Sequence, residues 1–238
     1  MEFSGKHAVI TGASSGIGRA IALELAQRGA HLHLVGRDPT RLEQVAEAAR
    51  AAGGTARVYR ADLAEDAALE ALARDLAALE RVDVLVHSAG VVALGPVATA
   101  PVEKLDWQYR VNLRAPFALT QALLPALERA RGQVVFINSG AGLRANAGWS
   151  QYAATKHGLK ALADALRAEV APRGVRVISV YPGRTATPMQ AEVHRAEGRA
   201  YHPERFVQPE DVALEVLAAL SLPARAVVTD LSIRPAVG

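Results

Sequence analysis

Short apolar runs alternate with longer amphipathic stretches along almost the whole chain. Runs rich in valine, isoleucine and leucine are typical of buried strands, whereas apolar residues repeating every three or four positions indicate helices. We therefore expect strands at 8–10, 31–36, 55–63, 82–90, 132–140, 174–183 and 226–233. We expect helices at 16–29, 39–53, 64–79, 151–172 and 209–220, and two more between 101 and 131 that Pro116 divides or kinks.

This order of elements predicts an α/β fold. Apolar strands separated by roughly ten or more helical residues pair in parallel and are covered by helices on both faces. Because crossovers between parallel strands are right-handed, we expect a Rossmann-like, doubly wound parallel sheet of about seven strands, in a single domain over residues 1–238. The polar segment 184–208 breaks the alternation. We expect it to be a mobile element on the substrate side, with a short helix at 190–198.

Composition narrows the classes of function. Half of the residues are hydrophobic and 21% are charged, and no apolar run approaches the roughly 18 residues of a membrane helix. The chain has no cysteine, which excludes disulfides and thiolate ligands, and we expect no metal. The net charge of +3 comes from scattered arginines, so neither nucleic acid nor membrane is an expected partner. The N-terminus does not resemble a signal peptide, and we expect a cytoplasmic location.

The first expected strand leads through a glycine-rich turn into a helix. Glycines let the backbone bend sharply there, and the helix N-terminus presents free N–H groups that favour a pyrophosphate. A plain structural turn is the alternative, but the strand–turn–helix context favours a dinucleotide site. The expected cofactor-binding residues of the turn are Gly12, Ser14, Ser15, Gly16, Ile17 and Gly18.

The end of the second expected strand indicates which dinucleotide binds. Sites for NAD(H) usually have a carboxylate at that point, but here the strand ends in Gly36 and Arg37. Glycine leaves room for a 2′-phosphate, and a planar guanidinium with a permanent charge binds phosphate well, so NADP(H) is favoured over NAD(H). Asp38 follows directly, and its alternative role is to cap the helix that begins at Pro39.

Tyr152 and Lys156 lie four residues apart in an expected helix, so their side chains share one face. A core tyrosine near a solvated lysine is the ordinary interpretation of such a pair. Alternatively, an ammonium about 5 Å from the phenol would favour the phenolate by roughly 3 kcal/mol at an effective dielectric constant of about 20. Burial opposes this effect, but we expect the net result to bring the pKa of Tyr152 down toward the range useful for acid–base chemistry.

Together these motifs resemble those of the short-chain dehydrogenase/reductase superfamily over nearly the whole chain. The matching features, in order, are the glycine turn, Asp62-Leu63, Ala89-Gly90, Asn112 within "VNL", Ser139, Tyr152 with Lys156, and Pro182-Gly183. The resemblance implies an oxidoreductase that transfers hydride between NADP(H) and a small carbonyl or alcohol substrate.

The resemblance also implies a catalytic tetrad of Asn112, Ser139, Tyr152 and Lys156. In this tetrad Tyr152 exchanges the proton, Ser139 donates a hydrogen bond to the substrate oxygen, and Lys156 also holds the nicotinamide ribose. Asn112 supports a water that links Lys156 to solvent. Taken locally, Ser139 and Asn112 could instead be turn or capping residues. Further cofactor contacts implied by the resemblance are Asp62, Leu63, Ser88, Ala89, Gly90, Tyr152, Lys156, Pro182, Gly183, Thr185 and Thr187.

The chain departs from the family pattern after the fourth expected strand, where His87 and Ser88 replace two asparagines. We expect a structural or ribose-proximal role for His87. The family resemblance also implies a homodimer or homotetramer. A regulatory protein that senses NADP(H) without turnover is the alternative function, which the intact tetrad disfavours.

The substrate pocket is expected to suit a largely apolar or aromatic ketone or aldehyde. The residues expected to line it are Val91, Leu143, Trp149, Tyr201 and members of the segment 184–208.

Overall fold

The computed structural model describes residues 2–236, so Met1 and positions 237–238 of the expected domain lie outside the described residues. Seven strands, all parallel, form one sheet in the order β3-β2-β1-β4-β5-β6-β7. The strands are β1 (His7–Thr11), β2 (His31–Gly36), β3 (Thr55–Arg60), β4 (Val84–His87), β5 (Gln133–Ile137), β6 (Arg176–Pro182) and β7 (Asp230–Ile233). This confirms the predicted doubly wound fold.

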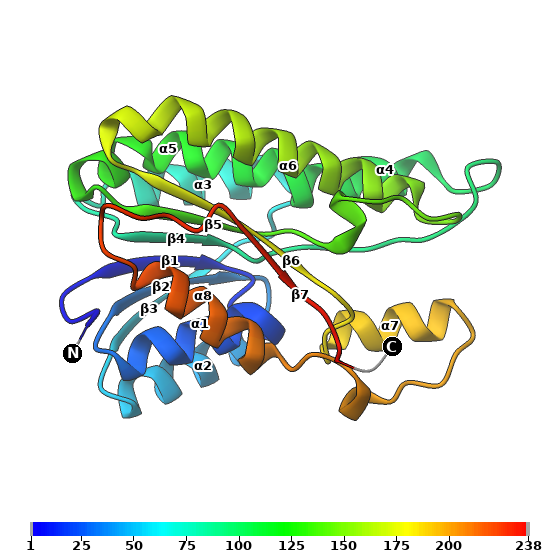
Figure 1. Ribbon diagram of the computed structural model, residues 1–238, viewed down its shortest axis with the longest axis horizontal. Helices are drawn as coiled ribbons and strands as arrows, with labels where there is room; N and C mark the ends of the chain where they lie inside the picture. The colour runs from blue at the N-terminus through cyan, green and yellow to red at the C-terminus, as the bar shows by residue number, and fades with distance from the viewer. Residues whose placement is uncertain (1, 237–238) are drawn as a thin grey trace.

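The helices cover the two faces of the sheet in separate layers. They are α1 (Gly16–Gln27), α2 (Pro39–Ala51), α3 (Asp66–Ala77), α4 (Val102–Tyr109), α5 (Ala115–Ala130), α6 (Ser150–Val170), α7 (Pro188–Ala196) and α8 (Pro209–Leu220). Figure 1 shows α1, α2 and α8 on one side of the sheet and α3 to α6 on the other.

Alternate side chains of each strand point into opposite layers, as a pleated strand requires. Ile10 of β1 and Leu34 of β2 pack with α1, α2 and α8, whereas Val9 and Val35 pack with α3, α5 and α6. All four side chains are fully buried. Strands buried on both faces need apolar residues at every position, and this explains their continuous apolar sequence.

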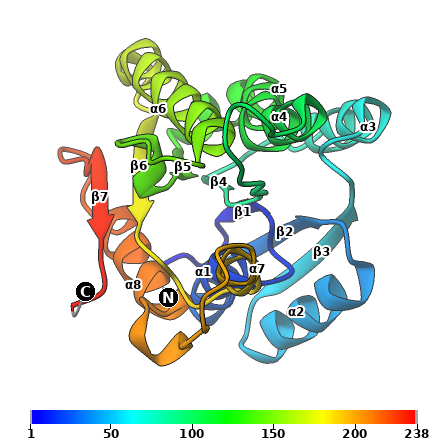
Figure 2. The ribbon, with the colours of Figure 1, turned by 90° about the vertical axis from the view of Figure 1, so that its right-hand side faces the viewer.

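The strand order reverses between β1 and β4, which are neighbours in the sheet although β2 and β3 separate them in sequence. A crevice forms at the carboxyl ends of the strands at such a switch point, and ligands of doubly wound proteins bind there. Figure 2 looks onto this end of the sheet, where α7 lies in front of the strands.

The two helical segments expected between 101 and 131 are present as α4 and α5, but the irregularity between them lies ahead of Pro116. The chain stays helical from Val102 to Ala130, and its irregular part is a π-helical turn at Arg110–Arg114, ahead of the proline. Because a helical turn precedes Pro116, its missing N–H leaves a carbonyl of that turn without a helical donor, at the position where the turn is irregular.

The C-terminal half contains one smaller difference from the expectation. The last strand is shorter than expected, because β7 pairs with β6 only from Asp230 onward. The short helix expected at 190–198 is present as α7. That the segment 184–208 is mobile stays a prediction.

Candidate active site

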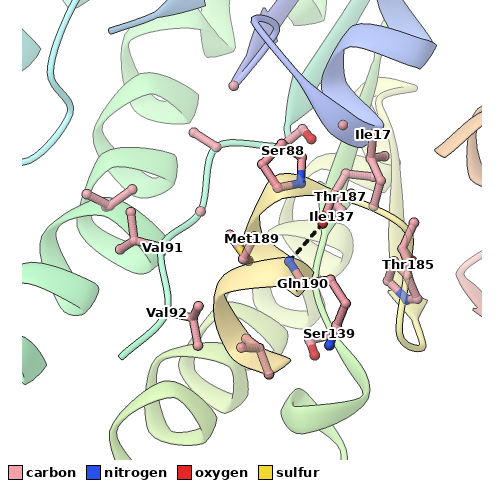
Figure 3. Close-up of a pocket in the computed structure, with 18 of the residues that line it drawn as sticks. Ile17, Ser88, Val91, Val92, Ile137, Ser139, Thr185, Thr187, Met189 and Gln190 are labelled. Atoms are coloured by element: carbon pink, nitrogen blue, oxygen red, sulfur yellow. Dashed lines mark hydrogen bonds between the residues drawn. The ribbon is translucent and has the colours of Figure 1, made fainter. Parts of the chain in front are cut away.

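A cavity of about 1060 Å³ opens at the carboxyl ends of the strands, where the sheet order reverses. Its lining comes from the turns after β1, β2, β3 and β4, from β5 and α6, and from β6 with the chain that leads into α7. Figure 3 shows part of this lining, with Ser88 and Ile17 at one end and Ser139 at the other. The cavity therefore joins the expected phosphate-binding turn to the expected catalytic residues.

The glycine turn has the backbone that its sequence predicts. Gly12 and Gly16 adopt φ values of +67° and +53°, in the left-handed region that favours glycine. A Cβ on Gly12 would lie 2.7 Å from the backbone nitrogen of Ala89, and one on Gly18 would lie 2.5 Å from the Gly12 oxygen. These glycines thus bring the turn close to the loop after β4.

The N-terminus of α1 is open to the cavity. Ser15 is its N-cap but makes no side-chain capping bond, so the first N–H groups of the helix have no such partner. Ser14, Ser15, Gly16 and Ile17 line the cavity, whereas Gly18 does not and acts through packing. Free N–H groups and the helix dipole together favour an anion at this point.

Two arginines lie at the far end of the cavity. Arg37 lines it as expected, and Arg41 from the first turn of α2 lines it as well. Asp38 caps α2 by accepting a hydrogen bond from the Arg41 backbone nitrogen at 3.0 Å, which confirms its alternative role. Asp62 and Leu63 also line this end. Asp62 accepts a bond of 3.0 Å from the backbone nitrogen of Ala64.

The loop after β4 borders the cavity through Ser88, Ala89 and Gly90. The hydroxyl of Thr11 accepts hydrogen bonds from the backbone nitrogens of Ser88 and Ala89, at 3.2 and 3.1 Å. The loop is thereby fixed against the end of β1.

His87 points away from the cavity into the core. Its Nε2 lies 2.8 Å from the Thr120 hydroxyl, and its ring stacks on Phe136. Burial lowers the pKa of His87 to about 3, so the ring is neutral at neutral pH. These contacts confirm the structural reading of His87 over the ribose-proximal one.

Ser139, Tyr152 and Lys156 meet at the other end of the cavity, and all three line it. Lys156 Nζ donates a hydrogen bond of 3.0 Å to the Ile137 carbonyl and lies 5.8 Å from the centre of the Tyr152 ring. Tyr152 and Lys156 are both buried, with 7% and 3% of their surface exposed. The ordinary interpretation of a solvated lysine is therefore wrong.

The expected lowering of the Tyr152 pKa is also wrong. Burial raises the pKa of Tyr152 to about 12, and the Ser139 hydroxyl only partly opposes that rise. Burial lowers the pKa of Lys156 from 10.5 to about 8. The ammonium is turned toward the Ile137 carbonyl, and desolvation outweighs its attraction for the phenolate. At neutral pH, Tyr152 is a neutral phenol beside a protonated lysine.

Asn112 does not line the cavity. Its side chain is fully buried in the π-helical turn, where it accepts a bond of 2.8 Å from the Val91 nitrogen and donates to the Val91 carbonyl and the Thr155 hydroxyl. A Cβ on Gly90 would lie 3.6 Å from Asn112 Oδ1 and 3.9 Å from Lys156 Nζ, so Gly90 lies between them. The expected water beside Asn112 stays a prediction.

The chain after β6 carries the remaining expected cofactor residues. Pro182, Gly183, Thr185 and Thr187 all line the cavity. Thr187 caps α7, and its hydroxyl accepts a hydrogen bond of 3.2 Å from the Gln190 nitrogen, drawn in Figure 3. The Thr185 hydroxyl instead donates to the Gly183 carbonyl at 3.1 Å.

Part of the expected substrate pocket is in place. Val91 and Trp149 line the cavity, but Leu143 and Tyr201 do not. Leu143 is 46% exposed at the surface, and Tyr201 packs against the ring of Phe206. Both residues lie in irregular segments, where sequence spacing does not indicate side-chain direction.

The sequence analysis missed Asn138, which precedes Ser139 directly. Its Nδ2 donates to the Lys156 carbonyl at 3.1 Å, and its Oδ1 accepts from the Ser139 nitrogen at 2.8 Å. Asn138 therefore ties the backbones of two expected catalytic residues together. The available signal in the sequence was an asparagine directly after an apolar strand. Arg41 and Arg234 also line the cavity and were missed.

The described part of the chain contains neither a membrane-spanning helix nor a metal site. No helix within residues 2–236 is long and apolar enough to cross a membrane. The same residues contain no cluster of histidines and carboxylates suited to a metal ion.

Comparisons with known proteins agree with this site. The sequence profile described as short chain dehydrogenase matches residues 6–198. Sepiapterin reductase of Chlorobaculum tepidum is 35% identical over 97% of this chain and 96% of its own. Glycine betaine reductase of Emericella nidulans is also 35% identical, over 98% of this chain, but the match covers only 19% of that larger protein.

Two solved structures resemble the chain closely. An alcohol dehydrogenase from the archaeon Thermococcus sibiricus, complexed with 5-hydroxy-NADP, has a TM-score of 0.87 at 29% identity over 97% of both chains. A metagenomic short-chain oxidoreductase in complex with NADP has a TM-score of 0.84 at 34% identity over 100% of both chains. The profile, the relatives and the fold lead to one conclusion: this chain belongs to the short-chain dehydrogenase/reductase family of oxidoreductases.

Proposed function

We propose that the protein interconverts a carbonyl compound and the corresponding alcohol, with NADP(H) as the hydride carrier and Tyr152 as the acid–base residue. One observation carries the proposal. A single cavity joins the open N-terminus of α1 to Ser139, Tyr152 and Lys156. Relatives named as reductases and dehydrogenases support the same class of reaction.

The residues present fit a dinucleotide. The N–H groups at the start of α1 would hold the pyrophosphate, Asp62 and Leu63 would border the adenine, and Lys156 would contact the nicotinamide ribose. Pro182, Gly183, Thr185 and Thr187 border the same cavity, as do Ser88, Ala89 and Gly90, and these residues would contact other parts of the cofactor. When bound, the nicotinamide supplies or accepts a hydride.

Arg37 and Arg41 both line the cavity, and their guanidinium groups would suit a 2′-phosphate, so we infer a preference for NADP(H) over NAD(H). The carboxylate of Asp38 is engaged by the Arg41 backbone and lies 3.3 Å from the Arg41 guanidinium, so it does not offer a free ribose acceptor. Several similar solved structures have NADP or NADPH in their descriptions, in line with this preference.

Because burial raises the pKa of Tyr152 to about 12, the phenol carries its proton at neutral pH and gives it up only to a strong base such as a developing alkoxide. Ser139 would donate a hydrogen bond to the substrate oxygen, and Tyr152 would transfer its proton to that oxygen as it becomes an alkoxide. The Lys156 ammonium would stabilise the phenolate that remains. In the reverse direction the phenolate removes the alcohol proton, so oxidation is favoured by higher pH.

The test is a panel of ketones and aldehydes assayed by the loss of NADPH absorbance, with NADH in parallel. We expect turnover of at least part of the panel, with NADPH the better cofactor. The variant Ser139→Ala should lower kcat by at least about 10-fold, the effect of one lost hydrogen-bond donor to a developing oxyanion. No turnover across the panel, although NADPH binds, would contradict the proposal.

A further inference from the structure

A second pair of arginines, far from Arg37 and Arg41 in sequence, borders the catalytic end of the cavity. Arg234 follows β7, and Arg144 follows the short helical turn Gly140–Gly142 after β5. Both line the same cavity as Ser139 and Tyr152. The redox chemistry described above uses neither of them.

Arg234 is held in a defined position. Its Nη1 donates a hydrogen bond of 2.7 Å to the Tyr181 carbonyl on β6. That bond uses one of five guanidinium donors, and the remaining ones form a planar fork suited to a carboxylate.

Gly140 makes room for this guanidinium directly beside Ser139. A Cβ on Gly140 would lie 3.3 Å from Nη2 and 3.5 Å from Nη1 of Arg234. The guanidinium therefore covers the Cα of residue 140, one position beyond the serine expected to contact the substrate oxygen. Arg144 begins close by, since its backbone nitrogen donates to the Gly140 carbonyl at 3.1 Å.

Neither arginine has a carboxylate partner within 4.0 Å among residues 2–236. Arg184 also lines the cavity, but Glu197 neutralises it through two hydrogen bonds of 2.9 and 2.8 Å. Among residues 2–236, the only carboxylate in the lining at this end is that of Glu192 on α7. The described side chains at this end of the cavity therefore carry an excess of positive charge.

Apolar side chains form part of the walls at this end. Val91, Val92, Ile137, Trp149 and Met189 line it, and Figure 3 shows Val91, Val92 and Met189 on the walls around the catalytic end. An apolar or aromatic body would fit between these walls, with an anionic group directed at the arginines.

We propose that the substrate is an oxo acid, or the matching hydroxy acid, with an apolar body and a carboxylate that binds Arg234 with help from Arg144. This inference rests on the proposed oxidoreductase function and names its substrate class. Arg234 is a specificity residue in this proposal. It fixes the carboxylate so that the carbonyl of the same molecule reaches Ser139 and Tyr152.

The test compares phenylglyoxylate with phenylglyoxamide, its neutral amide of nearly the same shape, as substrates with NADPH. We expect kcat/KM to be at least about 10-fold higher for the acid, since a charge-assisted hydrogen bond is lost with the amide. Arg234→Gln should lower kcat/KM for the acid by about 10-fold or more and for the amide by less than about 2-fold.

Arg195→Gln is the matched control, because Arg195 is an exposed arginine on α7 outside the cavity lining. It should leave both substrates unaffected. Equal kcat/KM for acid and amide, or equal losses for both in Arg234→Gln, would overturn the proposal.

A binding measurement separates this proposal from the proposed function. Titration calorimetry of phenylglyoxylate into the protein saturated with NADP⁺ needs no turnover. We expect binding by the wild-type protein that is weakened about 10-fold or more in Arg234→Gln. If binding shows this dependence but no carbonyl compound is reduced, the proposed function fails while the anion site stands. If carbonyl compounds are reduced but Arg234→Gln binds phenylglyoxylate as tightly as the wild type does, the proposed anion site is wrong and the proposed function stands.

Discussion

Lys156 is a buried ammonium with no carboxylate partner among residues 2–236, and its replacement gives an unusual expectation for stability. Burial lowers its pKa from the ordinary value of 10.5 to about 8. A difference of that size corresponds to about 3 kcal/mol of unfavourable free energy for the charged form in the folded protein. The variant Lys156→Met keeps an unbranched side chain of similar length and removes the charge.

The expected balance at pH 7 follows from two terms. Removing the buried charge relieves about 3 kcal/mol, while leaving the Ile137 carbonyl without its donor costs about 1–3 kcal/mol. Lys156→Met should therefore be as stable as the wild type or more stable by up to about 2 kcal/mol. An ordinary buried substitution instead destabilises by about 1 kcal/mol.

The pH dependence is the sharper test. Between pH 8 and 10.5 the unfolded chain binds more protons at Lys156 than the folded protein does, so the wild type gains stability as pH rises. From pH 7 to 10.5, the free energy of unfolding of the wild type should therefore rise by about 3 kcal/mol relative to that of Lys156→Met. Urea unfolding followed by circular dichroism at several pH values measures this difference.

Lys160 supplies the control on the same helix. It is partly exposed and forms an ion pair with Asp164, which raises its pKa. Lys160→Met should show no such shift between pH 8 and 10.5. If Lys156→Met and the wild type differ in free energy of unfolding by the same amount at every pH, Lys156 is not a desolvated cation in the folded protein.

Three further predictions concern the cofactor, the site and acid stability. Arg37→Ala should raise the Kd of NADPH by about 10-fold or more and leave that of NADH nearly unchanged, because one charge-assisted bond to phosphate is lost; equal weakening, measured by fluorescence titration, would argue against this. Asn138→Ala should lower kcat with little change in the Kd of NADPH, since Asn138 links Ser139 to the Lys156 backbone, and steady-state kinetics with that titration would check it. Burial lowers the pKa of His87 to about 3 and that of His33 to about 4, so the folded state binds fewer protons than the unfolded chain below pH 6.5. Stability should fall as the pH drops from 6.5 to 4, and His87→Asn should remove about 3 kcal/mol of that fall in urea unfolding, whereas an unchanged pH profile would contradict it.

The fold could be predicted from sequence because each of its signals is local. Strands with apolar residues at successive positions, such as 134–137, need cover on both faces, and the spacing between strands leaves room for crossover helices. The glycine turn could also be predicted, because Gly12 and Gly16 adopt positive φ values that favour glycine.

What could not be predicted depends on contacts between distant parts of the chain. The π-helical turn lies just ahead of Pro116 and holds Asn112, whose bonds to Val91 and Thr155 could not be predicted from the proline alone. Whether the pKa of Tyr152 rises or falls depends on how far burial outweighs the effect of the nearby charge. Spacing along a helix does not give that balance. Arg234 reaches Gly140 only through the pairing of β6 with β7.

Tyr152→Phe tests the central claim most directly, because it removes one hydroxyl and keeps the ring. Tyr181→Phe is the matched control, since Tyr181 is also a buried tyrosine and its hydroxyl has no hydrogen-bond partner within the described residues. We predict that Tyr152→Phe lowers kcat for carbonyl reduction by at least about 100-fold, the usual contribution of a general acid, while the Kd of NADPH stays within about 2-fold of the wild type. Tyr181→Phe should retain activity. Wild-type turnover in Tyr152→Phe would contradict the account of how this protein moves its proton.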